Sequence, residues 1–307
     1  MHNLRQLMTF VGVFEERSFS KAAQRLNATQ SGLSMQTQQL EQNIGSKLFE
    51  RSAKGVIPTY AGQRFYEHAV EIIRRIDQMD SEIKALSGGV SGEMKAGLMP
   101  TFTRAVLAPS LLNFMNSYPN VSVSIVEAYS GVLTEGVLSG DYDFAIVPQA
   151  PRRDGIKTRL LGTDREILVR RPDPSMPNLS GARLAELPPL KLVLPNRTNA
   201  RRTNFENYAE LHGIRIATIV SMDAMIATLE FVAQSDFVTI LPETICANDF
   251  DGKTRSLHPL LDPPLTVDYA VIQQSRTAIP PAATLFLAEL EAQYALLKHR
   301  WVDAGWV

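Results

Sequence analysis

The sequence predicts an α/β protein in which a small helical head precedes a larger body of alternating strands and helices. Three observations lead to this fold class. Residues 20–51 hold two short helical patterns joined by a tight polar turn. Residues 59–88 carry one long helical pattern, with neither Gly nor Pro between residues 63 and 87. Beyond a Gly-rich connector at 88–92, strand and helix patterns alternate, which is typical of doubly wound sheets.

The first two helices have the spacing of a helix-turn-helix. Asn27 tolerates the left-handed conformation that ends a helix, and Thr29 is suited to cap the next one. The second helix has a narrow apolar stripe and an opposite face of amides, hydroxyls and one thioether. The stripe is formed by Leu33, Thr37, Leu40 and Ile44, and the opposite face by Gln30, Ser31, Ser34, Met35 and Gln38.

These residues alone do not separate a DNA-reading pair from any small helical hairpin, but the flanking segments do. An amphipathic pattern at 4–14 can cover the pair. Residues 48–58 read as two short strands around the turn at Lys54-Gly55, which is a wing. A helix-turn-helix with a wing presents its second helix to DNA bases.

The charge distribution agrees with a DNA-binding head on a different kind of body. The chain has 307 residues, 45% of them hydrophobic, and a net charge of −1. Residues 1–60 hold seven Lys/Arg and four Glu, a charge of +3, so the remainder carries −4. A mildly basic head on an acidic body fits a nucleic-acid module joined to another function. No apolar run reaches the length of a membrane span and no signal peptide is recognised, so we expect a cytoplasmic protein.

The pattern at 59–88 predicts a helix that dimerises. A helix of this length extends about 40 Å, longer than a small winged domain can cover, although lying on its own domain's core is the simpler alternative. The apolar residues recur at steps of four and three, as in a coiled-coil seam: Phe65, Ala69, Ile72, Ile76, Met79 and Ile83.

The body is predicted to form two α/β lobes. Strand patterns occur at 94–98, 121–125, 142–147, 190–194, 216–220, 237–241 and 267–273, and helices at about 103–118, 132–138, 199–212, 222–233 and 282–297. We place lobe I at about 92–162 plus 267–300 and lobe II at about 163–266. Small ligands usually bind in the cleft between such lobes.

Catalytic and metal motifs were sought and are missing from the sequence. The five histidines are scattered, and there is no HExxH, Walker A, GxSxG or strand-linked GxGxxG pattern. The single cysteine, Cys246, lies in an apolar stretch and is expected to be a buried thiol rather than a redox switch. We therefore expect no enzyme, no cofactor and no metal.

The run from Leu4 to Gly62 resembles the winged helix-turn-helix of the LysR-type transcriptional regulators. It carries S-F-S-K-A-A-Q-R-L-N at 18–27, Q-S-G-L-S at 30–34, G-S-K-L-F-E-R at 45–51 and T-Y-A-G at 59–62. The resemblance implies a winged helix-turn-helix at 1–58, a linker and dimerisation helix at 59–88, and an effector-binding domain at 89–307 built like periplasmic solute-binding proteins. It also implies a homodimer or tetramer on inverted-repeat operator DNA, with RNA polymerase as a candidate partner.

The same resemblance and the helix faces together give the expected DNA contacts, which are Ser20, Lys21, Gln30, Ser31, Ser34, Met35, Gln38, Arg51 and Lys54. Gln30 and Gln38 can each offer an amide to adenine, so an A/T-containing site is expected. The family usually has proline, arginine and isoleucine where this chain has Ser31, Met35 and Thr37. No Lys or Arg occurs from 30 to 46, so phosphate contacts are left to Lys21, Arg25, Arg51 and Lys54. The alternative function is a small-molecule sensor with a degenerate head.

The expected effector site lies where two strands pass into helices, one in each lobe. Both turns offer backbone N–H groups and hydroxyls, which attract anions; the simpler alternative is that these residues only cap their helices. We hypothesise a small carboxylate or other anion held by Thr101, Thr103, Asn196 and Thr198. Gln149 and Thr239 would complete the polar lining, and Phe102 would add an apolar wall.

Overall fold

The computed structural model describes residues 3–52, 55–148, 153–197, 199–261 and 263–305. The head begins with three helices, whose first turns are each capped by a side chain: Asn3, Ser18 and Thr29 accept backbone N–H groups. A two-stranded antiparallel wing follows. These elements are α1 (Leu4–Glu16), α2 (Phe19–Arg25), α3 (Gln30–Ile44), β1 (Phe49–Ser52) and β2 (Gly55–Pro58).

The head has its own core, and α3 contributes the predicted stripe to it. Leu33, Thr37 and Leu40 are buried, and Ile44 packs at the edge. Glu41 is also buried, because its carboxylate accepts the N–H groups of residues 48 and 49 at 2.9 and 3.1 Å and thereby fixes the start of the wing. The helical pattern alone gave no sign of this capping role.

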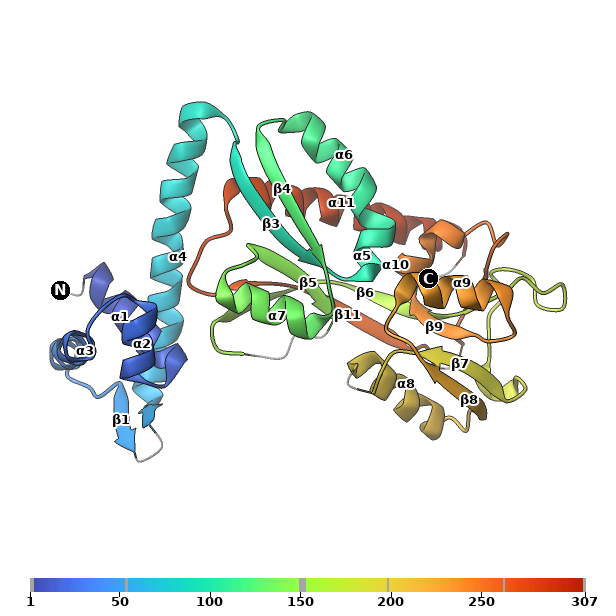
Figure 1. Ribbon diagram of the computed structural model, residues 1–307, viewed down its shortest axis with the longest axis horizontal. Coiled ribbons are helices and arrows are strands. Elements are labelled where there is room, and N and C mark those ends of the chain that lie inside the picture. The colour runs from blue at the N-terminus through green and yellow to red at the C-terminus, as the bar shows by residue number, and fades with distance from the viewer. Residues whose placement is uncertain (1–2, 53–54, 149–152, 198, 262, 306–307) are drawn as a thin grey trace.

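The long helix α4 (Tyr60–Gly88) divides into two parts. Ala69, Val70 and Ile73 are buried in the head core, and Phe65 packs beside them. Phe65 and Ala69 therefore pack within their own chain, which corrects their assignment to the dimer seam. Further along, Ile72, Met79 and Ile83 are 46%, 55% and 60% exposed, and Ile76 is half-buried. The helix projects away from the head and toward the body (Figure 1).

Lobe I is a mixed sheet covered by helices on both faces (Figure 1). Its strand order is β6-β11-β5-β3-β4; β3 is parallel to β4 and β5, whereas β11 is antiparallel to β5 and β6. The sheet is therefore not wholly parallel. Its strands are β3 (Gly92–Leu98), β4 (Val121–Glu127), β5 (Phe144–Pro148), β6 (Ile156–Arg170) and β11 (Thr266–Gln274). Its helices are α5 (Pro100–Phe102), α6 (Ala108–Ser117), α7 (Ser130–Ser139) and α11 (Pro281–Asp303), with a π-helical turn at Thr103–Leu107 between α5 and α6.

Lobe II is smaller and surrounds the far half of β6. Two strands pair in parallel with each other, and two others add antiparallel to β6. The strands are β7 (Leu190–Leu194), β8 (Ile216–Ser221), β9 (Thr239–Pro242) and β10 (Ser256–Pro259), and the helices are α8 (Ala200–Leu211), α9 (Met225–Gln234) and α10 (Glu243–Cys246), with short 3-10 turns at Leu184–Glu186 and Ala247–Asp249.

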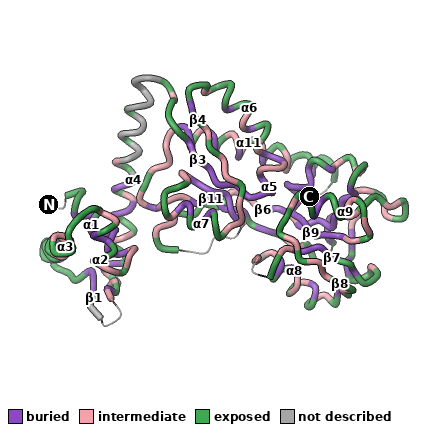
Figure 2. The backbone as a smooth tube through the Cα atoms, viewed as in Figure 1, coloured by how far each residue is buried: buried purple, intermediate pink, exposed green. Residues whose placement is uncertain are grey.

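The strand β6 is the main element that the sequence did not predict. It runs 15 residues and continues from lobe I into lobe II. Its first half is largely exposed and its second half is buried, so it shows neither a clean alternation nor a continuous apolar run. Figure 2 shows that the central strands of the body are largely buried (purple) and that the surrounding helices and loops have exposed stretches (green).

His258 on β10 is buried in lobe II and should make the stability of the protein depend on pH. Nδ1 lies 3.1 Å from the Ser180 carbonyl, and Nε2 lies 3.0 Å from the Ser256 hydroxyl. Burial lowers the pKa of His258 below 6.5. A histidine that is harder to protonate when folded favours unfolding as pH falls below its unfolded pKa.

We therefore expect the urea midpoint of unfolding to fall between pH 7.5 and 5.5, and this fall to shrink in His258→Asn. His299 is exposed on α11, so His299→Asn is the matched control and should leave the fall unchanged. An equal pH response in both variants would contradict the assignment to His258.

Within the described residues, no helix is long and apolar enough to cross a membrane. The same residues contain no cluster of His, Cys, Asp and Glu suited to a metal ion. Cys246 is completely buried, and burial raises the pKa of its thiol well above the usual value. The thiol is therefore neither accessible nor ionised in this conformation.

Candidate functional site

The exposed face of α3 carries the predicted base-reading side chains. Gln30, Ser31, Met35 and Gln38 are exposed, and Ser34 is half-buried. The hydroxyl of Ser20 on α2 donates to Gln30 Oε1 at 3.0 Å, which leaves the Gln30 amide hydrogens for a base. Met35 is 68% exposed at the middle of this face, where an apolar group can contact a thymine methyl.

Of the four expected phosphate contacts, the structure describes the side chains of Lys21 and Arg25. Lys21 is exposed, but Arg25 is engaged inside the protein. Its guanidinium binds Glu15 and Glu16 of α1, ten and nine residues earlier in the chain, so it is not free to bind a phosphate. Arg51 lies on β1, where only the backbone is described, and Lys54 lies outside the described residues.

A narrow pocket lies between the two lobes, and its cavity has a volume of about 20 Å³, room for roughly one water molecule. It forms where the strand-to-helix turns after β3 and β7 meet, as the sequence predicted. Its apolar wall consists of Met99, Pro100, Val193, Leu194, Pro195, Met222, Met225 and Leu241, and its polar groups are Thr101, Tyr129, Asn199, Arg201, Thr228 and Thr239.

The structure brings only two of the predicted effector residues to this pocket. Thr101 is on the wall and 3% exposed. Thr239 is also on the wall, but its hydroxyl donates to the Val193 carbonyl at 2.8 Å, so it is a structural group that leaves little for a ligand. Gln149 and Thr198 lie outside the described residues.

Three other predicted effector residues lie elsewhere. Phe102 is fully buried in the lobe I core, edge-on to Tyr269, so it is not a pocket wall. The hydroxyl of Thr103 binds Glu127 and lies 3.2 Å from the Pro100 carbonyl, both within lobe I, and Thr103 is absent from the pocket lining. Asn196 is exposed and absent from the pocket lining.

Asn196 acts instead at the mouth of the pocket. Its backbone N–H donates to the Asp223 carboxylate at 2.9 Å, and its side-chain amide binds the same group. From lobe I, the Tyr129 hydroxyl donates to the Asp223 carbonyl at 2.7 Å. Burial and the charge of Asp223 raise the pKa of Tyr129, which keeps this phenol protonated as a donor. The bond joins the two lobes across the mouth.

Arg201 is the residue that sequence reasoning missed. It is the second residue of α8, whose first turn is capped by Asn199. Its Nε and Nη2 bind both oxygens of Glu166 on β6 at 3.0 and 2.9 Å, and Nη2 also reaches the Ile240 carbonyl. Nη1 forms no bond with any residue that the structure describes. The pocket thus has a cation on its wall, fixed by a carboxylate on the strand that joins the lobes.

A winged helix-turn-helix head joined to a two-lobed α/β domain with a narrow pocket between its lobes is the architecture of a bacterial transcriptional regulator. Two family models match the chain: "Bacterial regulatory helix-turn-helix protein, lysR family" over residues 4–63 and "LysR substrate binding domain" over residues 87–295. The chain belongs to the LysR family of transcriptional regulators.

Individual relatives span most of the chain. The regulator TfdT of Cupriavidus pinatubonensis is 32% identical over 62% of this chain and 84% of its own length. BenM of Acinetobacter baylyi is 27% identical over 85% and 86%. Among solved structures, CbnR, a LysR family transcriptional regulator, covers 94% of this chain and 100% of its own with a TM-score of 0.55 and 24% identity. Full-length BenM has a TM-score of 0.54 at 22% identity, covering 100% of this chain and 99% of its own. These likenesses establish the shared fold.

Proposed function

We propose that this regulator binds an inverted-repeat operator as a homodimer or a dimer of dimers, and that a small carboxylate bound between the lobes controls it. The observation that carries the effector class is Arg201, a cation on the wall of a pocket otherwise lined by apolar side chains, hydroxyl groups and the Asn199 amide. An ionised ligand group bound by a guanidinium in a desolvated site forms strong, directional hydrogen bonds. The apolar wall favours a ligand with a hydrophobic body.

Two further observations support DNA binding by the head. The α3 face presents amides and hydroxyls to solvent, as base readout requires. CbnR, which shares the fold, has been crystallised with its target DNA. The small number of available Lys and Arg residues near α3 favours lower affinity at high salt, because phosphate contacts supply most of the affinity.

The effector class is tested by a thermal-shift screen of the full chain against aliphatic and aromatic carboxylates and their neutral amides. A ligand at a hundred times its Kd stabilises the folded state by about 2.7 kcal/mol. We expect stabilisation by a carboxylate and none by its amide. Stabilisation by the amide alone would contradict the anionic class and leave the pocket in place.

The pocket itself is tested with Thr101→Val, which keeps the shape and removes the hydroxyl. We expect the carboxylate found in the screen to bind at least tenfold more weakly, about 1.4 kcal/mol, while operator affinity without ligand stays unchanged. The control is Thr163→Val, on the lobe I part of β6. The Thr163 hydroxyl donates to the Asp268 carboxylate at 2.6 Å, and Thr163 does not line the pocket. Equal ligand affinity in wild type and Thr101→Val would place the effector elsewhere.

Base readout by α3 is tested with Gln30→Ala. We expect this variant to lose discrimination at one base pair of each half-site, at a cost of about 1–3 kcal/mol. Lys21→Ala, in contrast, should weaken binding to all sequences and reduce the salt dependence. Competition binding against half-sites mutated one pair at a time measures both. An unchanged ranking of half-sites in Gln30→Ala would contradict the assignment of this face.

A further inference from the structure

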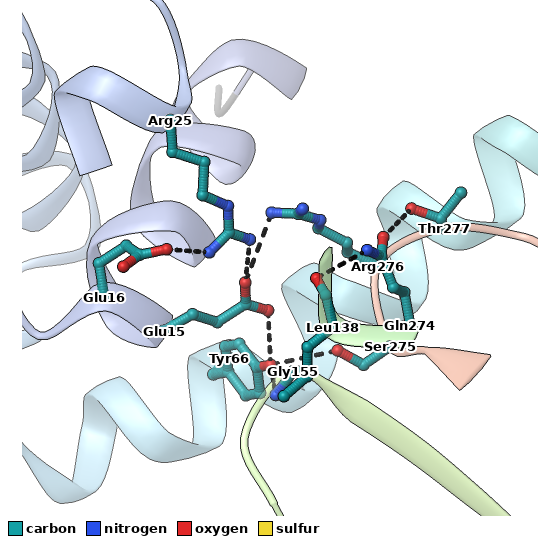
Figure 3. A network of polar contacts seen from close by, with 10 residues as sticks. All are labelled: Glu15, Glu16, Arg25, Tyr66, Leu138, Gly155, Gln274, Ser275, Arg276 and Thr277. Carbon is teal, nitrogen blue, oxygen red and sulfur yellow. Dashed lines mark hydrogen bonds and ion pairs between the residues drawn. The ribbon is translucent and has the colours of Figure 1, made fainter. Parts of the chain in front are cut away.

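The head rests on lobe I of its own chain through a polar junction that the sequence did not predict (Figure 3). The name junction refers here to five residues: Glu15, Tyr66, Gly155, Ser275 and Arg276. Glu15 belongs to α1 and Tyr66 to α4, whereas the other three lie in the segments before β6 and after β11. Ser275 is 7% exposed, whereas Glu15, Gly155 and Arg276 line a polar, water-accessible cavity of about 640 Å³ beside it. Outside it, Arg17 of the head binds Asp154 of the body.

Tyr66 is the centre of the junction, and its hydroxyl uses its full bonding capacity. It lies 2.9 Å from Glu15 Oε1, 3.2 Å from the Ser275 hydroxyl and 3.1 Å from the Gly155 backbone nitrogen. A phenol donates one hydrogen bond and accepts two. Because an ionised Glu15 can only accept, Tyr66 donates to Glu15 and accepts from Ser275 and Gly155. One oxygen therefore joins the head to both body segments.

The groups around the Tyr66 hydroxyl are themselves fixed. The Tyr66 ring stacks on Phe14 with centroids 4.0 Å apart and planes 10° from parallel. The other oxygen of Glu15 binds Arg25 of α2 and lies 3.5 Å from Arg276. Gly155 has a φ of +86°, and the Ser275 N–H donates to its carbonyl at 2.9 Å. Neither side of the junction can shift without breaking bonds on that side.

The two body segments of the junction are the ends of the two strands that pass between the lobes. β6 begins at Ile156, directly after Gly155, and continues through Glu166 into lobe II. β11 returns from lobe II and ends at Gln274, directly before Ser275; the two end residues are paired in the sheet. Ten residues of extended strand, about 33 Å, separate Ile156 from Glu166, the residue that holds Arg201 at the pocket.

We propose that this junction transmits the state of the effector pocket to the DNA-binding head through β6 and β11. The inference rests on the proposed effector pocket. A ligand anion on Arg201 competes with Glu166 for the guanidinium, which changes how lobe II is held on β6. Because β6 and β11 are paired along lobe I and end together at Tyr66, a change in their tilt reaches the head as a rigid displacement.

The test is a double-mutant cycle on operator affinity that needs no effector. Arg201→Gln breaks the bidentate contact with Glu166, and Arg201→Lys is the milder alternative that retains the charge if the first variant does not fold. Tyr66→Phe keeps the ring stack on Phe14 and removes only the hydroxyl. Tyr118→Phe is the matched control, since this lobe I tyrosine packs against the core and its hydroxyl has no bond with the described residues. The DNA is a duplex selected by the wild-type chain from a random-sequence pool.

We expect the Arg201 substitution to change operator Kd at least fivefold in the wild-type and Tyr118→Phe chains, and less than twofold in the Tyr66→Phe chain. Distant sites without coupling are additive to within about twofold, whereas allosteric coupling amounts to about 5–150-fold. The same change of Kd in all three backgrounds, or no change in any, would overturn the proposal.

Hydrogen–deuterium exchange separates this result from failure of the proposed function. Tyr66→Phe removes the acceptor of the Gly155 N–H, so exchange of the segment around Gly155 should accelerate, and Tyr118→Phe should not change it. Arg201→Gln should alter exchange of the same segment in the chain that retains Tyr66 and should not alter it in the Tyr66→Phe chain. If the wild-type chain selects no DNA, the proposed regulatory function is wrong. The exchange rates around Gly155 still test the coupling through the junction, and unchanged rates in Tyr66→Phe and Arg201→Gln would overturn it.

Discussion

Changing Ile72 and Met79 together to Asp is expected to convert the protein to a monomer and to abolish operator binding. The two side chains lie seven residues apart on α4 and are 46% and 55% exposed in the single chain. Asp at either position should therefore have little effect on the free energy of unfolding of a single chain. In a helix-to-helix seam the same residues would bury two unpaired carboxylates per chain, at several kcal/mol each. A monomer contacts one half-site and loses most of the affinity of the inverted repeat.

Light scattering and operator titration measure the two consequences. Gln63→Asp/His68→Asp is the control, because both residues are exposed on α4 and neither belongs to the apolar seam. It should retain the wild-type mass. A wild-type mass for the Ile72→Asp/Met79→Asp variant would place the dimer contact somewhere other than α4.

The sequence predicted the head and the long helix well because local patterns determine both. Thr29 caps α3 as expected, Thr59 caps α4 at the start of the predicted long helix, and the apolar stripe of α3 is buried. The sequence did not show how far the head core extends along α4. Apolar positions such as Phe65 and Ala69 have the same spacing whether a helix packs on its own domain or on a partner, so only the structure assigns them to the head core.

The sequence predicted the location of the pocket but not most of the residues that line it. A strand followed by a polar helix start indicates where a cleft lies, which is why Thr101 is on its wall. The residue that matters most to its charge, Arg201, sits on the second position of α8 and faces the pocket only because Glu166 of β6 holds it there. Glu166 is 35 residues away in sequence, on a strand that the sequence analysis missed. Likewise, Asn196 looked like a ligand group, but Asp223 engages it.

Removing Arg201 alone is expected to destabilise the body strongly, and removing Glu166 as well should reverse the loss. The side chains are 12% and 6% exposed and share two hydrogen bonds. Burial opposes the charge on Arg201, but Glu166 outweighs burial and keeps the pKa of the guanidinium above its usual value. Breaking a buried ion pair on one side costs about 3–5 kcal/mol, because the remaining charge is left without a partner.

Arg201→Met should therefore lower the free energy of unfolding by about that amount, whereas Arg201→Met/Glu166→Met should be close to wild type. Urea unfolding followed by tryptophan fluorescence reports on this region, since Trp301 is buried in lobe II against Phe250. The double variant should fold and yet bind no carboxylate, because the pocket has lost its cation. If the double variant were as unstable as Arg201→Met, the loss would come from packing around α8 and β6 and not from the unpaired carboxylate of Glu166.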